Sequence, residues 1–207
     1  MATNVLIVED QSMPRQLFEM LIESSSSYHV LYSIESAAFA PVYCDKYPIE
    51  LVIMDVIMKD GSNGLEAAQK IKTAHPDIKI IIVTSMPEVS FIARAKEIGV
   101  NSFWYKEANT DTILEIMDRT MNGENVFPEK SPTVRLGNIN SDELTNKEIE
   151  VLRYMTKGLS NQEIAERLFV EITTIKTHIK HMLQKTGFSN RTELAIQARI
   201  AGIVIGE

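Results

Sequence analysis

Short apolar runs alternate with segments of helical periodicity through the first 121 residues. The apolar runs predict five strands, at residues 5–8, 29–33, 51–54, 78–84 and 103–105. The segments that follow them predict helices at residues 14–24, 39–47, 65–75, 89–98 and 111–122. Strands that are apolar throughout are typical of a parallel sheet with helices on both faces. The pattern therefore predicts a doubly wound α/β domain with a five-stranded parallel sheet at residues 1–121.

The first of these helices has an apolar stripe of its own. Leu17, Met20 and Leu21 follow one another at three- and four-residue spacing, which places them on one face of a helix. Gly99 stands where the fourth helix is expected to stop, because glycine is the usual residue just after a helix end.

The periodicity is lost after residue 121. Residues 122–143 are rich in Pro, Gly, Ser and Asn and predict a linker. From residue 144 the pattern is helical to the end, which predicts a small all-α domain at residues 144–207. Two of its helix starts match a capping box with flanking apolar residues, one at Thr145 and Glu148 and one at Ser160 and Glu163.

Charge supports the division into two domains. Residues 1–121 carry 10 Lys and Arg against 17 Asp and Glu, a net of −7, whereas residues 144–207 carry 9 against 7, a net of +2. We expect two units with different partners. The sequence has no apolar run long enough to cross a membrane and no signal-peptide pattern at its start. Its one cysteine, Cys44, fits a small buried apolar residue in a cytoplasmic protein.

Polar residues follow four of the predicted strands. Glu9 and Asp10 come after the first strand, Asp55 after the third, Thr84 after the fourth and Lys106 after the fifth. The carboxyl ends of parallel strands meet at one edge of a sheet, so we expect these side chains to converge. Converging carboxylates suit Mg²⁺, and a carboxylate held there can accept a phosphoryl group.

These residues resemble the receiver domain of two-component response regulators, a flavodoxin-like fold. The matching positions are Glu9 and Asp10, Asp55 with Met58 and Gly64 after it, Thr84, and residues 99–106 with Phe103 three positions before Lys106. The resemblance implies phosphorylation of Asp55 by a sensor histidine kinase. It also implies Mg²⁺ held by Glu9, Asp10, Asp55 and the backbone carbonyl of Ile57, and a phosphate-sensing switch formed by Thr84, Phe103 and Lys106. The family often has proline after the methionine, and here Lys59 follows Met58.

The helix predicted at residues 173–186 has two distinct faces. Its apolar residues lie within about 100° of arc, and the opposite side carries Thr173, Thr177, Lys180, His181 and Gln184, with Lys176 at the flank. With the helix at residues 160–168, this forms a helix-turn-helix whose polar face suits a DNA major groove. A solvated polar face on a small bundle is the alternative.

Residues 144–205 resemble the LuxR-type DNA-binding domain of the NarL/FixJ subfamily, through the stretches LTNKEIEVL, GLSNQEIAERL, TTIKTHIKHMLQK and SNRTELA. The resemblance implies DNA contacts by Lys176, Thr177 and Lys180, with Asn161, Thr174 and Arg191 as candidate phosphate contacts. Glu171 departs from the family, which usually has serine or a similar cap before the recognition helix. The last helix, residues 192–201, resembles the family's dimerisation helix, or is plain core.

Taken together, the sequence predicts a response regulator and transcription factor rather than an enzyme. Its expected partners are a sensor histidine kinase, double-stranded promoter DNA, RNA polymerase and, after activation, a second copy of the chain. Two alternatives remain open. One is a Mg²⁺-dependent phosphatase with an aspartyl-phosphate intermediate, against which Ile57 stands where such enzymes often carry a second Asp. The other is a constitutive DNA-binding dimer, against which the complete acidic pocket argues.

Overall fold

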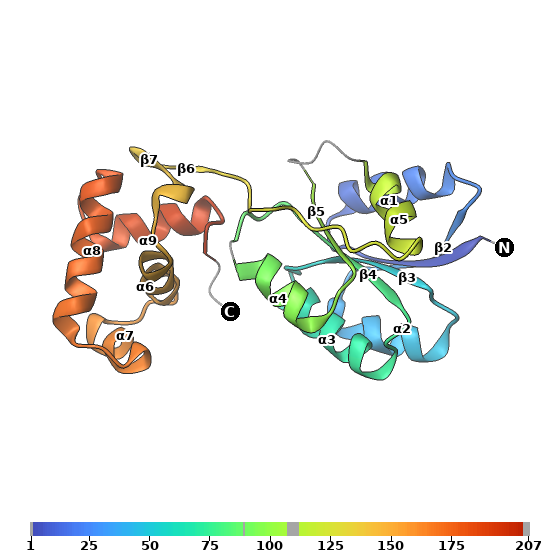
Figure 1. Cartoon of the computed structure of the whole chain (residues 1–207), viewed down its shortest axis with the longest axis horizontal. Coiled ribbons are helices and arrows are strands. Elements are labelled where there is room, and N and C mark those ends of the chain that lie inside the picture. The colour runs from blue at the N-terminus through green and yellow to red at the C-terminus, as the bar shows by residue number, and fades with distance from the viewer. Residues whose placement is uncertain (1, 89, 107–111, 205–207) are drawn as a thin grey trace. The chain divides into compact units, whose positions relative to one another are not determined.

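The computed structural model describes residues 2–88, 90–106 and 112–204, and the chain forms two compact units. The larger unit comprises Met1–Ser85 and Ser90–Lys130, and Ser131–Glu207 fall in the smaller one (Figure 1). Each unit has its own hydrophobic core. No described helix has the length and apolar character needed to cross a membrane.

The larger unit is a five-stranded parallel sheet with the strand order β2-β1-β3-β4-β5. This order is that of flavodoxin-like folds, so the predicted fold class is confirmed. Helices α1 and α5 cover one face of the sheet, and α2, α3 and α4 cover the other (Figure 1). The strands are β1 (Thr3–Val8), β2 (Tyr28–Ile34), β3 (Leu51–Asp55), β4 (Lys79–Thr84) and β5 (Ser102–Tyr105). The helices are α1 (Ser12–Glu23), α2 (Ala40–Lys46) after the short 3₁₀ helix η1 (Ala37–Phe39), α3 (Gly64–Ala74), α4 (Ser90–Ile98) and α5 (Ile113–Met121).

The predicted elements all appear, with ends that shift by one or two residues. The predicted helices at 89–98 and 111–122 begin at residues 89 and 111, which lie outside the described residues. Every residue of β3 is buried, because it is covered on both faces and flanked by β1 and β4. Successive side chains of a strand point to opposite faces, so Leu51 and Ile53 pack with α1 and α5.

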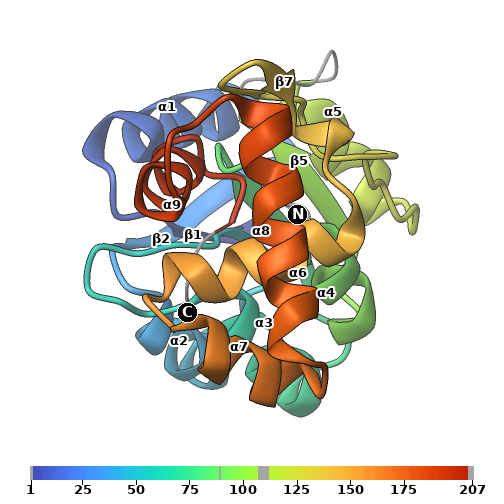
Figure 2. The same ribbon diagram turned by 90° about the vertical axis from the view of Figure 1, so that its left-hand side faces the viewer.

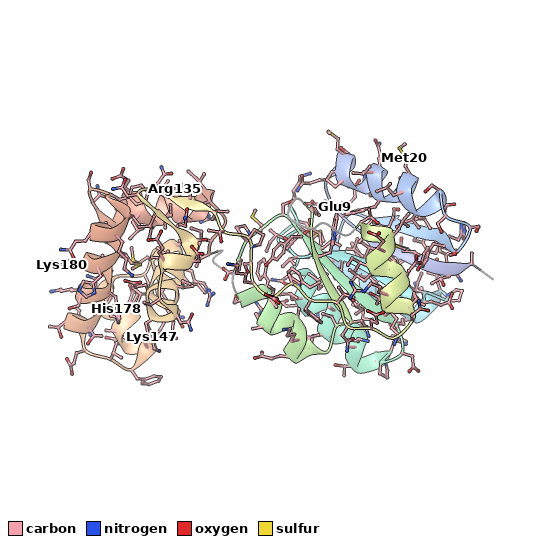
Figure 3. The ribbon with its side chains drawn as sticks, turned by 45° about the horizontal axis from the view of Figure 1, so that its top comes forward. Glu9, Met20, Arg135, Lys147, His178 and Lys180 are labelled. Carbon is pink, nitrogen blue, oxygen red and sulfur yellow. The ribbon has the colours of Figure 1, made fainter. Side chains whose placement is uncertain are left out.

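The apolar stripe expected on α1 is not the buried one. Phe18 and Ile22 pack against the sheet, whereas Leu17, Met20 and Leu21 are 54%, 72% and 37% exposed. Figure 3 shows Met20 pointing away from the sheet. The helix carries apolar residues on two sides, and periodicity alone does not say which side faces the sheet.

The stretch predicted as a linker, residues 122–143, is partly built into both units. After α5, the Phe103 amide donates to the Val126 carbonyl at 2.8 Å, and the Val126 amide donates to Ser102 Oγ at 3.1 Å. Residues up to Lys130 therefore belong to the larger unit. Further on, β6 (Arg135–Leu136) pairs with β7 (Ile139–Asn140), followed by the 3₁₀ helix η2 (Ser141–Glu143). Turn-rich hairpins and linkers share this composition, so composition alone does not distinguish the two.

The smaller unit packs four helices around a core of its own (Figure 2). They are α6 (Asn146–Thr156), α7 (Asn161–Leu168), α8 (Ile172–Thr186) and α9 (Arg191–Ile200). Both predicted capping boxes form: Thr145 with Glu148 begins α6, and Ser160 with Glu163 begins α7. Gly187 adopts the left-handed conformation that ends α8. The β6–β7 hairpin adds to the predicted all-α unit, because Leu136 and Ile139 are buried in its core.

Candidate functional site

Three carboxylates meet at the carboxyl edge of the sheet. Glu9 and Asp10 follow β1, and Asp55 is the last residue of β3. One oxygen of each lies within 4.8 Å of one oxygen of the other two. Glu9 and Asp55 are buried and Asp10 is half-buried. The structure thus brings together the three acidic residues that were predicted to converge at the ends of the strands.

Lys106 supplies the positive charge of this cluster. Its Nζ donates to Glu9 Oε2 at 2.5 Å and to Asp55 Oδ2 at 2.9 Å, and its side chain is 10% exposed. The pKa of Asp55 is raised to about 6, mainly because the carboxylate is buried; Lys106 acts in the opposite direction, and the neighbouring Glu9 contributes to the rise. The pocket therefore holds more negative charge than Lys106 alone offsets.

The backbone around Asp55 is closely packed. The Val56 amide donates to Asp55 Oδ1 at 2.7 Å. Gly64, at the start of α3, comes so near that a Cβ atom there would lie 1.9 Å from the Asp55 carbonyl oxygen. This contact explains why a glycine stands at position 64, where the family match includes one.

The loop between β3 and α3 leaves the Ile57 carbonyl available. Ile57 pairs with Asn63 in an isolated antiparallel bridge. The two hydrogen bonds around this bridge run from the Gly64 amide to the Val56 carbonyl and from the Met58 amide to the Ser62 carbonyl. Neither hydrogen bond of the bridge involves the amide or the carbonyl of Ile57. The Ile57 carbonyl oxygen therefore accepts no hydrogen bond from this bridge.

The residues at this edge fit a divalent cation. Asp10 Oδ1 is buried and has no hydrogen-bond partner among the described residues. An unsatisfied buried carboxylate oxygen is costly, and a hard cation removes that cost. Carboxylate and carbonyl oxygens are the ligands that Mg²⁺ prefers in proteins. The acidic cluster thus has the composition expected of a receiver's Mg²⁺ site.

Two of the predicted switch residues, Thr84 and Phe103, lie on β4 and β5, the strands that follow β3 in the sheet order. Thr84 is the last residue of β4 and is buried, and its carbonyl accepts from the Lys106 amide at 3.0 Å. Phe103 on β5 is 1% exposed, and its ring centre is 5.0 Å from that of Tyr105. Phe103 thus points inward in this structure.

The polar face predicted on α8 is exposed. Ile175, Ile179 and Met182 are buried in the core of the smaller unit. On the other side, Thr173, Thr174, Lys176, Thr177, Lys180, His181 and Gln184 are all exposed. Figure 3 shows Lys180 extending from the outer side of α8. The Thr177 hydroxyl donates to the Thr173 carbonyl at 2.9 Å, which leaves its oxygen able to accept a further hydrogen bond.

Two of the predicted phosphate contacts are bound to each other. Arg191, at the start of α9, donates through Nη1 to Asn161 Oδ1 at 2.7 Å and through Nη2 to the Leu159 carbonyl at 2.6 Å. A groove of about 460 Å³ joins Asn161 to Lys176 and Lys180. The sequence suggested these residues one by one. It carried no signal that Arg191 on α9 would form a hydrogen bond with Asn161 on α7, 30 positions away.

The turn of the helix-turn-helix has two unusual residues. Glu171 precedes α8 and makes no side-chain capping hydrogen bond, as its poor capping ability leads one to expect. Phe169, which ends α7, adopts a left-handed conformation with φ of 53° and is 94% exposed. Nothing in the sequence pattern distinguishes Phe169 from a core aromatic, so its exposure could not be predicted.

Comparisons with known proteins agree with this architecture. The family model of the response regulator receiver domain matches residues 5–118, and that of bacterial regulatory proteins of the luxR family matches residues 142–198. A response regulator protein named VraR from Staphylococcus saprophyticus is 32% identical over 204 residues, 96% of this chain and 97% of the relative. The chain belongs to the response regulators that join a receiver domain to a LuxR-type DNA-binding domain.

Solved structures lead to the same fold. RcsB from Salmonella enterica serovar Typhimurium, bound to promoter P1flhDC with the phosphomimetic BeF3−, matches with a TM-score of 0.64 at 20% identity, over 95% of this chain and 98% of that one. A LuxR-family DNA-binding response regulator from Staphylococcus aureus matches with a TM-score of 0.51 at 31% identity, over 58% of this chain and 96% of that one. Together with the receiver and luxR-family matches, this fold makes the protein a DNA-binding transcriptional regulator.

Proposed function

We propose that Asp55 is the phosphoryl acceptor of this regulator and that its phosphorylation controls DNA binding. The observation that carries the proposal is the place of Asp55: it is buried at the end of β3, within hydrogen-bond distance of Lys106 and beside two further carboxylates. A rigid strand end holds the carboxylate still, and the surrounding charges match those that balance a transferring phosphoryl group.

Glu9, Asp10, Asp55 and the Ile57 carbonyl would hold Mg²⁺. When bound, Mg²⁺ offsets negative charge on the phosphoryl oxygens. The Asp55 carboxylate forms the new O–P bond while the N–P bond to the histidine of a sensor kinase breaks, and the imidazole leaves with the bonding electron pair. Lys106, already 2.9 Å from Asp55 Oδ2, balances the added charge, and the Thr84 hydroxyl donates to the phosphate.

The signal then passes to the smaller unit. Thr84 turns toward the phosphate and Phe103 changes rotamer, which favours one of two states of the receiver surface. In the active state the chain dimerises, and Lys176, Thr177 and Lys180 read the major groove, while Thr174, Asn161 and Arg191 contact phosphates. A dimer fits two half-sites, and RcsB has been solved as two dimers bound to two DNAs. The proposed partners also include RNA polymerase, and the proposed location is the cytoplasm.

Sedimentation of the full chain tests this coupling. The wild type and Asp55→Ala are compared with and without Mg²⁺ and beryllofluoride, which mimics the aspartyl phosphate. We expect a shift from monomer to dimer, and tighter binding to promoter DNA, in the wild type with both additives. An identical response in Asp55→Ala would contradict the proposal.

A further inference from the structure

Lys59 stands in the loop between Asp55 and α3, close to the acidic cluster. The Gly61 amide donates to the Met58 carbonyl at 3.0 Å, which closes a turn with Lys59 at its second position. Gly61 has φ of 82°, and the Asp60 carboxylate accepts from the Ser62 amide and hydroxyl. This turn fixes where the backbone of residue 59 points.

Both donors of Lys59 are directed at Asp10. The Lys59 main-chain amide donates to Asp10 Oδ2, and its ammonium donates to the Asp10 carbonyl at 3.1 Å. Arg15, on α1, donates through Nη1 to the neighbouring Glu9 carbonyl at 2.8 Å. Two cationic side chains thus hold successive carbonyls of the segment that carries two of the three clustered carboxylates.

The hydrogen bond from the Lys59 amide makes the two carboxylate oxygens of Asp10 differ in their surroundings. Oδ2 is held by Lys59, and Oδ1 stays buried without a partner among the described residues. A carboxylate with one oxygen fixed loses its freedom to rotate, so the other oxygen keeps one direction. That oxygen is the one left to serve the cation.

We propose that the main-chain amide of Lys59 positions Asp10 as a cation ligand, an inference that rests on the proposed Mg²⁺ site. Proline, which the family often has at this place, fits the second position of a turn but has no amide hydrogen. Lysine therefore gives this chain a hydrogen bond to a ligand carboxylate that proline cannot make. The ammonium of Lys59 also donates a hydrogen bond to the backbone carbonyl of Asp10.

Two substitutions separate the amide from the side chain. Lys59→Ala removes the ammonium and keeps the amide, whereas Lys59→Pro removes both and suits the turn. Calorimetric titration of the full chain with Mg²⁺ alone measures the affinity, with Asp10→Asn as the benchmark for a lost ligand. We expect Lys59→Ala to bind within about twofold of the wild type and Lys59→Pro about tenfold more weakly. Equal affinities of Lys59→Ala and Lys59→Pro would overturn the inference.

A second measurement does not depend on the proline variant. In the wild-type chain, hydrogen exchange at the residue 59 amide is expected to be slow, and Asp10→Ala should make it fast. A fast amide in the wild type would overturn the inference. If wild type binds Mg²⁺ and the two Lys59 variants match, the inference fails and the proposed function stands. If the wild type binds no Mg²⁺, the proposed cation site itself is wrong, and the inference with it.

Discussion

Lys106 and Asp55 lie 51 positions apart in the sequence and are joined by a hydrogen bond of 2.9 Å at the carboxyl edge of the sheet. The same ammonium also binds Glu9, so one cation serves two buried carboxylates. This contact requires that β1, β3 and β5 end at the same level, which their parallel arrangement ensures.

Removing this cation should destabilise the larger unit. In Lys106→Met, Glu9 and Asp55 would remain buried without their ion pair, which costs about 3 kcal/mol of unfolding free energy in comparable cases. Urea unfolding followed by the fluorescence of Trp104, the one tryptophan in the sequence, measures the effect, with exposed Lys70→Met as control. Unchanged stability of Lys106→Met would show that the ion pair contributes little. Added Mg²⁺ should restore part of the loss.

The smaller unit should lose stability in acid through Glu148. Burial acts to raise the pKa of Glu148, but hydrogen bonds from Lys185 and Thr145 outweigh it and hold the pKa below its ordinary value of 4.5. A lowered pKa means that the unfolded state binds the proton more tightly. The stabilisation is therefore complete above pH 4.5 and is lost as the pH falls through the lower folded-state pKa.

Glu148→Gln tests this pH dependence. At pH 7 the variant should be less stable by about 1–3 kcal/mol, because a buried hydrogen bond to a charged group is lost. Its stability should then fall less than that of the wild type on acidification below pH 4.5. Circular dichroism follows the helices, while Trp104 fluorescence should be unaffected because Trp104 packs with Phe18 in the larger unit. Parallel acid profiles of the two proteins would contradict the account.

The Ser102 hydroxyl should stabilise the packing of the segment after α5 against β5. Its hydroxyl accepts from the Val126 amide and is 2.6 Å from that of Thr120, which in turn donates to the Ile116 carbonyl. In Ser102→Ala the Val126 amide loses its acceptor, at a cost of about 1 kcal/mol. Hydrogen exchange should become faster at the Val126 amide. It should also become faster at the Phe103 amide, which donates to the Val126 carbonyl. Ser24→Ala, at an exposed hydroxyl, is the control.

Lys180 should contribute to DNA binding and Lys147 should not. Both are exposed, but Lys180 lies on the polar face of α8, and Lys147 lies on α6 with an ion pair to Glu150. Lys180→Ala should weaken binding to a selected promoter duplex about tenfold and reduce its salt dependence. Fluorescence anisotropy at several salt concentrations measures both. Equal losses in Lys180→Ala and Lys147→Ala would indicate a general charge effect rather than a recognition face.

The fold was largely predictable because its main signals are local. Fully apolar strands such as residues 51–54 predicted the parallel sheet, and the capping residues Thr145 and Ser160 predicted two helix starts to the residue. Leu17 and Met20 indicated one face of α1, but the sequence did not show which face packs, because that depends on the sheet beneath the helix. The hairpin around Leu136 was missed, since its burial depends on a core that forms from distant helices.

The candidate site was predictable for a different reason. Parallel strands end at one edge, so Glu9, Asp55 and Lys106 could be placed together before their distances were known. Contacts that depend on loop geometry could not be inferred in this way. Two hydrogen bonds are examples: the one from the Lys59 amide to Asp10, and the one from Arg191 to Asn161. Their partners are far apart in the sequence, and nothing in the sequence shows that they meet in space.

The central claim is that Asp55 accepts the phosphoryl group. In the most direct measurement, the full chain is incubated with Mg²⁺ and a small phosphoryl donor such as phosphoramidate. The modified residue is then identified by mass spectrometry. We expect one phosphoryl group per chain in the wild type, on Asp55, removable by hydroxylamine, and none in Asp55→Asn. A phosphoryl group on another residue of the wild type, or equal labelling of Asp55→Asn, would contradict the account.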